Sequence, residues 1–358
     1  MSGPNKSAKS SATLAEITSQ PEIWRQCLKE LRGTGILEEI VQETESCTEW
    51  VFIGCGTSFY LAEAAAASWT LLTGQPADAL PASEPLLFPR LTVRASKNVQ
   101  AIVISRSGRT SEAVKAANLL SGKYHIPTLG ITCAAGSLLE KACNRTILLA
   151  AADEKSMVMT RSFSSMLLVL QSLASSKSGK KEFSSSFDRM ADHFSRRMGT
   201  LVGQIEEFVS THEFADYVFL GQGPFHAVAR EASLKVTEMS CSYSQSFHTL
   251  EFRHGPKAIV SPETCLTFFL SESGSQAEAE VLAEMHELNG VTIAVCNRAT
   301  ETIRRSSDLV FELGFDGPEL ATLAPFVVPG QLLGFFTAMK KKLNPDEPKN
   351  LSRVVILD

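Results

Sequence analysis

The chain has 358 residues, of which 44% are hydrophobic and 20% are charged, and this length suffices for two hydrophobic cores of ordinary domain size. Its formal net charge of −5 at pH 7 provides no basic field, so we expect neither nucleic acid nor an anionic membrane as a partner. The eight cysteines form no Cys-x-x-Cys pair, the N-terminus is polar, and we expect no membrane span of about 18 uncharged apolar residues, so the sequence predicts a soluble protein of the reduced cytoplasm.

The N-terminal part of the sequence predicts a tail followed by helices. Residues 1–13 are rich in Ser and Lys and contain little that could be buried, which predicts a disordered tail. From Leu14 to Ile40 the pattern predicts one or two amphipathic helices around Pro21. We expect these helices to open a first domain that spans residues 14–179.

Two stretches of the chain repeat the same succession of features. In each copy an apolar run leads into a turn of small residues, a second apolar run leads into a Ser-rich turn, and a third landmark follows. The copies comprise 54–59, 105–110 and 130–132, and then 221–226, 271–276 and 294–296. The matching order and spacing indicate a duplicated unit in which strands alternate with helices. Parallel strands joined by helices need right-handed crossovers and cover on both faces, so we predict two tandem, doubly wound α/β domains with parallel, flavodoxin-like sheets.

Three further segments connect or follow these copies. The prolines between Thr73 and Arg90 predict a loop that crosses to the next strand. The stretch 172–186, dense in Ser, Lys and Gly, marks a boundary near residue 179, so the second domain is expected over residues 180–343 and begins with a linking helix. The tail 344–358 has two prolines and no helical period, so we expect it to lie extended over the body; the alternative is a frayed terminus.

The Ser-rich turn of the first copy has the composition of an anion site. It reads Ser105-Arg106-Ser107-Gly108-Arg109-Thr110 and stands between an apolar strand and the start of a helix. A helix N-terminus offers unpaired amides and a positive dipole end, and hydroxyls there can complete a cage around a phosphate dianion. Ser58, on the neighbouring turn, is placed to reach the same anion. The alternative is that these hydroxyls only cap helices. The pairing of two such turns in one repeat favours the phosphate site.

A second set of polar residues lies on a predicted helix of the second copy. Glu231, Lys235 and Glu238 are spaced so that they share one helical face. One interpretation is a solvated stripe of ion pairs. The other is catalytic, because a carboxylate can move a proton between adjacent carbons while an ammonium stabilises developing oxyanion charge.

The stretch that follows contains two histidines, His248 and His254, in a turn bounded by Gly255 and Pro256. A histidine with a near-neutral pKa suits acid and base work on the ring oxygen of a sugar. Metal binding is the alternative, but no third ligand stands at a recognised metal spacing. A structural role for either histidine fits the sequence better than metal does.

Together these motifs resemble those of the sugar isomerase (SIS) domain family, most closely the isomerase half of glucosamine-6-phosphate synthase and its free-standing aminosugar-phosphate deaminase relatives. The resemblance covers residues 14–358 and is carried by five segments, 55–58, 105–110, 234–238, 254–256 and 344–351. It implies that the sugar phosphate is bound by Ser58, Ser105, Ser107, Thr110 and the backbone amide of Arg106. It further implies that Glu238 shuttles a proton between C1 and C2, that Lys235 assists beside it, and that His254 opens the sugar ring.

The resemblance also implies how the protein assembles, and this chain departs from the family pattern at some positions. In the family the ring-opening histidine reaches across from the partner subunit, which implies a homodimer with a shared active site. The resemblance implies that the tail 344–358 completes the active site. The family's tail presents a lysine to the substrate where this chain has Arg353, and arginine is not a simple substitute for lysine. Thr160 lies in a segment, 158–163, that resembles the sugar-contacting loop. Position 2 is Ser2 rather than a nucleophilic cysteine, so we expect no production of ammonia from glutamine.

The sequence therefore predicts an enzyme that converts a hexosamine 6-phosphate, such as glucosamine 6-phosphate, into a ketohexose 6-phosphate and ammonia, with no metal and no organic cofactor. Within the same class, the alternatives are an ammonia-dependent, synthase-like isomerase and a fructosamine-phosphate deglycase. From a different class, the alternative is a non-catalytic sugar-phosphate sensor, which would need the phosphate cage but no proton shuttle. The presence of both Glu238 and His254 favours the enzyme.

Overall fold

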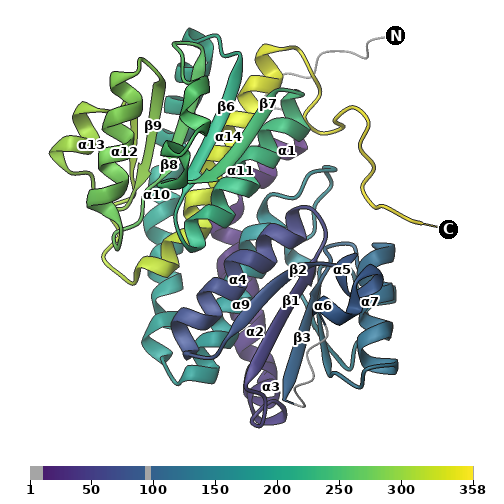
Figure 1. The fold of residues 1–358 in the computed structure, drawn as a ribbon. Coiled ribbons are helices and arrows are strands. Elements are labelled where there is room, and N and C mark those ends of the chain that lie inside the picture. Colours follow the sequence, from purple (N-terminus) through teal and green to yellow (C-terminus); the bar gives the residue numbers. More distant parts are fainter. Residues whose placement is uncertain (1–10, 93–97, 358) are drawn as a thin grey trace. The chain divides into compact units, whose positions relative to one another are not determined.

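The computed structural model describes residues 11–92 and 98–357, and these divide into two compact units, each built around one parallel sheet (Figure 1). The first unit contains residues 22–154, 161–187 and 352–357. The second unit contains residues 11–21, 155–160 and 188–351. The chain therefore passes between the units several times, and the C-terminal end of the tail groups with the first unit.

The first sheet has five strands in the order β2-β1-β3-β4-β5. Their bounds are Glu49–Gly54 (β1), Ala77–Pro81 (β2), Val99–Ile104 (β3), Thr128–Thr132 (β4) and Arg145–Leu148 (β5). The central strands are buried along their length, as expected of apolar runs in a parallel sheet. The apolar runs that lead into the turns at 54–59 and 105–110 form β1 and β3, so the strands predicted there are confirmed.

The second sheet repeats this topology, with the order β7-β6-β8-β9-β10. Its strands are Asp216–Gly221 (β6), Tyr243–His248 (β7), Thr264–Phe269 (β8), Val291–Cys296 (β9) and Leu309–Glu312 (β10). All pairings in both sheets are parallel. The predicted duplication, and the predicted class of two doubly wound α/β repeats, are confirmed.

The first turn of each repeat uses glycine in the same two ways. A Cβ on Gly54 would lie 2.3 Å from the carbonyl oxygen of Ser58, and one on Gly221 would lie 2.4 Å from that of Phe225. Two residues later Gly56 and Gly223 adopt φ values of 55° and 54°, in the left-handed region that glycine tolerates best. The close approach and the positive φ explain why both copies keep Gly-x-Gly between strand and helix.

Helices surround the first sheet. They are Gln20–Thr34 (α2), Ile36–Glu43 (α3), Thr57–Thr73 (α4), Glu84–Leu87 (α5), Pro89–Thr92 (α6), Ser111–Gly122 (α7), Leu138–Ala142 (α8), the 3₁₀ helix Ala150–Ala152 (η2) and Arg161–Ser178 (α9). Helix α4 packs against α9, and the small residues of α7 pack with the valines and isoleucines of β1 and β3 in a continuous core. The next helix, Lys181–Thr211 (α10), contains the point where the chain leaves the first unit for the second.

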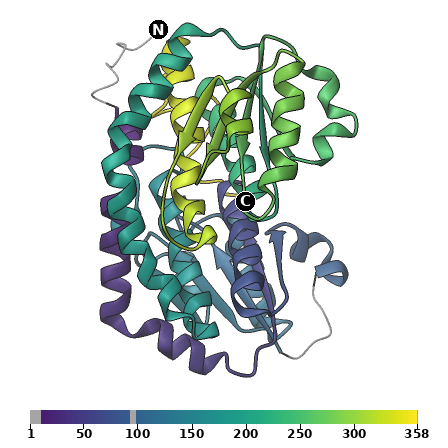
Figure 2. The ribbon, with the colours of Figure 1, turned by 90° about the vertical axis from the view of Figure 1, so that its left-hand side faces the viewer.

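The helices of the second unit are Ala12–Thr18 (α1), Pro224–Ser240 (α11), Glu251–Arg253 (η3), Pro256–Ile259 (η4), Ser275–Glu287 (α12), Glu301–Arg305 (α13), Glu319–Thr322 (η5) and Leu323–Lys340 (α14). Helix α14, yellow in Figures 1 and 2, packs along α11. A Cβ on Gly330 would lie 2.3 Å from that of Ala232, and one on Gly334 would lie 2.7 Å from the carbonyl oxygen of Lys235. These glycines let the two helices approach closely beside Lys235.

The expectation that no stretch is long and apolar enough to span a membrane is wrong for residues 320–339, which carry no charge. Residues Glu319–Lys340 have the length and hydropathy of a membrane span, yet 94% of their apolar 18-residue stretch is buried inside the protein. A buried core helix passes the same test of composition, and α14 packs against α1, α11 and β9 of its own unit. The apolar run is therefore accounted for as a core helix.

The segment between Thr73 and Arg90 corrects a second expectation, because it forms strand β2 and helix α5 rather than only a loop. Strand β2 lies at the edge of the first sheet and ends at Pro81. Proline has no amide to donate, so it is tolerated at an edge strand, and the turn signal of the prolines concealed the strand.

The predicted disordered tail, residues 1–13, falls mostly outside the described residues, but its last residues differ from the prediction. Ser11 is the N-cap of α1, and its side chain accepts a hydrogen bond from the amide of Leu14. Both Ser11 Oγ and Thr13 Oγ1 donate to Asp346 Oδ1, at 2.6 and 2.8 Å. The prediction extended too far because the partner that orders these residues stands more than 300 positions away in the sequence.

Candidate functional site

The Ser-rich turn of the first unit has the geometry of an anion-binding loop. Ser105 follows β3, and its Oγ lies 3.1 Å from Thr110 Oγ1 at the N-terminus of α7. Thr110 is the N-cap residue of α7, but its side chain makes no capping hydrogen bond within the described structure. Ser107 Oγ accepts from the amide of Arg109 at 3.2 Å. Helix capping therefore does not account for the hydroxyls of Ser105 and Thr110.

The turn that carries Ser58 stands at the same edge of the sheet. Strands β1 and β3 are adjacent and parallel, with Ile53 opposite Val103, so the turns that follow them are neighbours. Ser58 lies in the first turn of α4, whose N-cap is Gly56 and has no side chain to cap the helix. The structure thus places Ser58, Ser105, Ser107 and Thr110 at adjacent strand ends of one unit.

Buried contacts of Arg106 hold the Ser-rich turn in place. The guanidinium of Arg106 lies 3.1 Å from Glu154 Oε2, and both side chains are almost completely buried. Ser162 Oγ donates to the same carboxylate at 2.5 Å. The carbonyl of Arg106 accepts from Thr132 Oγ1 at 3.1 Å. Since the side chain of Arg106 points to Glu154, its backbone amide is the part of this residue that fits the predicted role. Sequence reasoning missed both contacts, because Glu154 belongs to no motif and the segment 158–163, which contains Ser162, pointed only to Thr160.

The end of the C-terminal tail lies beside this turn, within the first unit. Arg353 Nη2 donates to Asp153 Oδ1 at 3.0 Å and to the carbonyl of Glu154. Farther along, the amide of Leu357 donates to Ser111 Oγ at 2.9 Å, in the first turn of α7. Residues 344–357 contain no helix or strand, as the prolines predict. Arg353 is thus an anchor of the tail on Asp153, and its contact with a sugar stays a prediction.

The carboxylate and lysine cluster of the second unit is buried rather than solvated. Lys235 Nζ lies 3.3 Å from Glu231 Oε1 and 2.5 Å from Glu238 Oε2, and the side chains of Lys235 and Glu231 are 0% exposed. Glu238 differs from them, because its side chain is 19% exposed. The solvated-stripe interpretation of this helical face is therefore wrong, and Glu238 is the member of the cluster that solvent or a ligand can reach.

The charges of this cluster depend on one another. Burial alone would lower the pKa of Lys235, but the negative charges of Glu231 and Glu238 raise it above its ordinary value. Lys235 therefore remains an ammonium that donates to Glu238 Oε2. A carboxylate held in place by a permanent cation, with part of its surface accessible, is suited to positioned proton transfer.

His254 lies on an exposed turn of the second unit. Gly255 follows it with φ of 120°, a conformation that requires glycine, and Pro256 begins η4. The residues on either side are clamped by one carboxylate, since Arg253 Nε and Lys257 Nζ lie 2.7 and 2.6 Å from the two oxygens of Glu284. This clamp holds the turn while the imidazole of His254 remains exposed. No local pattern in the sequence pointed to Glu284.

The second histidine of this region, His248, ends β7 and stacks on His226, with 3.8 Å between ring centroids. Within residues 11–92 and 98–357, no three His, Cys, Asp or Glu side chains gather as a metal site would need. Burial, together with the charges of His248 and Arg230, lowers the pKa of His226 from 6.5 to about 4. His226 therefore stays neutral at pH values where an exposed histidine would be charged.

This lowered pKa predicts a loss of stability in acid. As the pH falls from about 6.5 towards 4, the unfolded chain takes up a proton at this histidine that the folded chain does not. With allowance for partial exposure of the ring, the loss is on the order of 1–2 kcal/mol. His226→Phe, which copies Phe59 of the first repeat, should remove that part of the pH dependence. Urea unfolding at pH 7, 5 and 4 measures the free energy of unfolding of both proteins. An equal loss of stability with falling pH in wild type and His226→Phe would refute the assignment of this pH dependence to His226.

Thr160 stands in a well-packed segment of the second unit. Its side chain is 0% exposed, and its carbonyl accepts from Gln331 Nε2 at 3.2 Å. Four residues earlier, Ser156 Oγ donates to the carboxylate of Glu16. The structure therefore shows Thr160 in a packed environment, and its proposed contact with a sugar stays a prediction.

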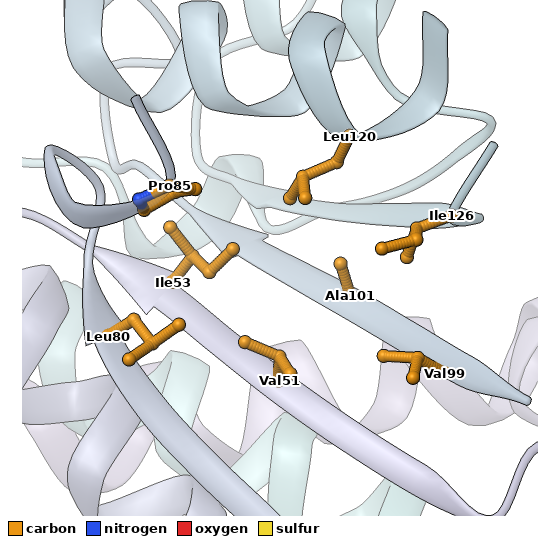
Figure 3. Close-up of a pocket in the computed structure, with 8 residues that line it drawn as sticks. All are labelled: Val51, Ile53, Leu80, Pro85, Val99, Ala101, Leu120 and Ile126. Atoms are coloured by element: carbon orange, nitrogen blue, oxygen red, sulfur yellow. The ribbon is translucent and has the colours of Figure 1, made fainter. Parts of the chain in front are cut away.

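Among the cavities of the described residues, one in each unit lies away from these site residues. The one in the first unit is lined by apolar side chains and offers a phosphate no donor from them: Val51, Ile53, Leu80, Pro85, Val99, Ala101, Leu120 and Ile126 (Figure 3). The one in the second unit is bordered by Arg197 and Arg304, but Arg304 pairs with Glu312 at 2.6 Å and Arg197 donates to the Glu312 carbonyl at 2.9 Å. We interpret both as packing features.

The sheets and the two polar clusters define the class: a tandem, doubly wound α/β protein with hydroxyl-bearing turns in one repeat and a buried carboxylate–lysine cluster in the other. A family model described as the SIS domain matches residues 46–176 and 216–327, which together cover both repeats. The chain belongs to the SIS domain family.

Its relatives include enzymes of phosphorylated sugars. The chain is 25% identical over 348 residues to a glutamine–fructose-6-phosphate aminotransferase (isomerizing) of Methanothermobacter thermautotrophicus, which covers 96% of this chain and 57% of that protein. Among solved structures, a glucosamine-6-phosphate deaminase of Thermotoga maritima matches with a TM-score of 0.80 and 26% identity, over 97% of this chain and all of the other. A tagatose-6-phosphate ketose/aldose isomerase of Escherichia coli shares the fold, with a TM-score of 0.84 and 21% identity over 99% of this chain and 98% of that one.

Proposed function

We propose that the protein is an enzyme that deaminates and isomerises a hexosamine 6-phosphate, releasing ammonia and a ketohexose 6-phosphate. The observation that carries this proposal is the environment of Glu238. Its carboxylate is partly exposed, and its Oε2 lies 2.5 Å from Nζ of the fully buried Lys235. A protein that only senses a sugar phosphate has no use for such a group. The similarity to a glucosamine-6-phosphate deaminase over the full length of that chain supports the same reaction.

In the proposed reaction His254 assists opening of the sugar ring, which frees the C1 aldehyde. Glu238 removes the proton from C2, and the resulting enolamine is protonated at C1. This step turns C1 into a CH₂OH group and leaves a ketimine at C2. Water adds to the ketimine carbon, the carbon–nitrogen bond breaks, and ammonia leaves a ketone behind. Lys235 donates a hydrogen bond that holds Glu238 in place, and its ammonium offers positive charge to the developing oxyanion.

The phosphate serves this reaction as a remote handle. We assign it to the hydroxyls of Ser58, Ser105, Ser107 and Thr110 and to the amide of Arg106. Binding energy gained at a non-reacting group can be used to orient the reacting carbons. The shared homodimer site remains part of the proposal, with His254 acting across the subunit interface. The exposure of the His254 turn supports that arrangement.

One observation favours a second direction for the same chemistry. Several relatives are glutamine–fructose-6-phosphate aminotransferases (isomerizing), although the chain spans only 57% of the length of the one from Methanothermobacter thermautotrophicus. We therefore keep as second candidate a synthase-like isomerase that uses free ammonia. A fructosamine-phosphate deglycase would run a similar proton shuttle on another phosphorylated amine.

A panel assay separates the deaminase from the deglycase. Purified protein is incubated with glucosamine 6-phosphate, galactosamine 6-phosphate, a fructosamine 6-phosphate and the unphosphorylated aminosugars, and released ammonia is measured. The proposal predicts ammonia from a hexosamine 6-phosphate and none from the free sugars. Activity on free sugars equal to that on the phosphates would contradict the role of the hydroxyl-bearing turns. Release of an amine other than ammonia from the fructosamine would favour the deglycase.

A further inference from the structure

The second repeat contains its own copy of the Ser-rich turn, and that copy already holds an anion. Ser271-Glu272-Ser273-Gly274-Ser275-Gln276 follows β8 and leads into α12, as Ser105–Thr110 follows β3 and leads into α7. Three donors of this turn converge on the carboxylate of Glu319. The amides of Glu272 and Ser273 donate to its Oε1 at 2.5 and 3.1 Å, and Ser273 Oγ donates to its Oε2 at 2.6 Å.

The carboxylate comes from a distant part of the chain. Glu319 begins the 3₁₀ helix η5, which leads into α14, and the carbonyl of Glu319 accepts from Thr322 Oγ1 at 2.7 Å. The residue is thus fixed at its backbone while its side chain reaches the turn. In the first repeat, the atoms equivalent to these three donors are the amides of Arg106 and Ser107 and the hydroxyl of Ser107.

Other changes in the second copy remove the groups that a phosphate would use. Ser271 Oγ, the equivalent of Ser105 Oγ, donates to Glu278 Oε1 at 2.5 Å. The positions of Ser58 and Thr110 are occupied by Phe225 and Gln276. The two arginines of the first turn, Arg106 and Arg109, are replaced by Glu272 and Ser275. The two backbone amides and the Ser273 hydroxyl of an anion-binding loop are therefore kept, while the other hydroxyls of the cage and the arginines of the turn are lost.

We infer that Glu319 is the resident anion of the second-repeat turn, so that each chain takes up one phosphorylated ligand rather than two. A carboxylate on the same chain has a high effective concentration at the turn and excludes a free phosphate from it. The position of the Glu319 carboxylate at this turn is supported by contacts within the second repeat alone and does not depend on the proposed function. The count of one ligand rests on the proposed function, in which the first turn binds the sugar phosphate.

The test counts phosphate ions bound per chain, by equilibrium dialysis of the full-length protein against labelled inorganic phosphate. We expect one site for the wild type and for Glu319→Gln, because the amide still fills the turn. The double variant Glu272→Arg/Glu319→Ala empties the turn and restores the residue type of the first repeat, so it should bind two. Adding Ser273→Ala to that variant should weaken the new site at least tenfold.

The outcomes separate this inference from the proposed function. Two sites in the wild type, or one site in a double variant whose circular dichroism and melting curve show a folded protein, would overturn the inference. No site in the wild type and one in the double variant would support the role of Glu319 and contradict the proposed phosphate site of the first turn. If the double variant does not fold, the same count on Glu272→Gln/Glu319→Ala, which also removes the negative charge at position 272, decides, with one site against the inference and two for it.

Discussion

Glu238→Gln is expected to reduce kcat/KM for hexosamine 6-phosphate deamination by about 10²- to 10⁴-fold, the usual contribution of a positioned general base. The amide has the size of the carboxylate but cannot accept the C2 proton. Lys235 keeps Glu231 as a partner at 3.3 Å, so the fold should tolerate the change. Affinity for inorganic phosphate should stay within about twofold of wild type, because the proposed phosphate donors belong to the first unit.

A matched control for this variant is Glu280→Gln, which removes an exposed carboxylate from α12 of the same unit. Its turnover should stay within about twofold of wild type, as is usual for surface substitutions. Ammonia release over a range of substrate concentrations from below to above KM gives kcat/KM and kcat for both variants. Normal turnover in purified Glu238→Gln would show that another group moves the proton.

Lys235→Met is expected to destabilise the protein by about 3–5 kcal/mol, the cost of breaking a buried ion pair by removing one partner. The substitution leaves the carboxylates of Glu231 and Glu238 facing each other without the cation that lies 3.3 and 2.5 Å from them. Methionine fills a similar volume, so the loss reports on charge rather than on a cavity. Deamination should fall as well, because Glu238 loses the ammonium that holds it.

Urea unfolding with a constant m-value measures this loss of stability. Lys341→Met serves as the control, since this lysine lies at the exposed end of α14 and donates to Ser242 Oγ at 2.6 Å. Its loss should cost less than about 1 kcal/mol. Equal stability of Lys235→Met and wild type would mean that the buried carboxylates do not depend on the lysine, against the electrostatics described above.

The fold was largely predictable because the central strands of a parallel sheet are continuous apolar runs, and the duplication presented each landmark twice. Strand β2 escaped because an edge strand needs neither a long apolar run nor a full set of amides, and Pro81 at its end has the signature of a turn. The uncharged run 320–339 was overlooked as a possible span, and only its packing identifies it as a core helix.

The candidate site shows a sharper limit. Spacing places Glu231, Lys235 and Glu238 on one helical face, but it does not tell whether that face meets solvent. The answer depends on Gly330 and Gly334, about 100 residues further along the chain, which allow α14 to pack closely over Lys235 of α11. The same holds for Glu154 behind Arg106 and for Glu319 on the second turn, since neither carboxylate is close in sequence to the groups that it binds.

The central claim, that Glu238 moves a proton between two carbons of a phosphorylated aminosugar, is tested most directly by NMR in heavy water. Wild-type protein is incubated with glucosamine 6-phosphate, and the C2 proton of the substrate and the C1 protons of the product are followed. We predict loss of the C2 proton signal with deuterium appearing at C1 of the ketose, and neither change with Glu238→Gln. Retention of the C2 proton by wild-type protein that binds the sugar phosphate and releases no ammonia would contradict the account and indicate a sensor.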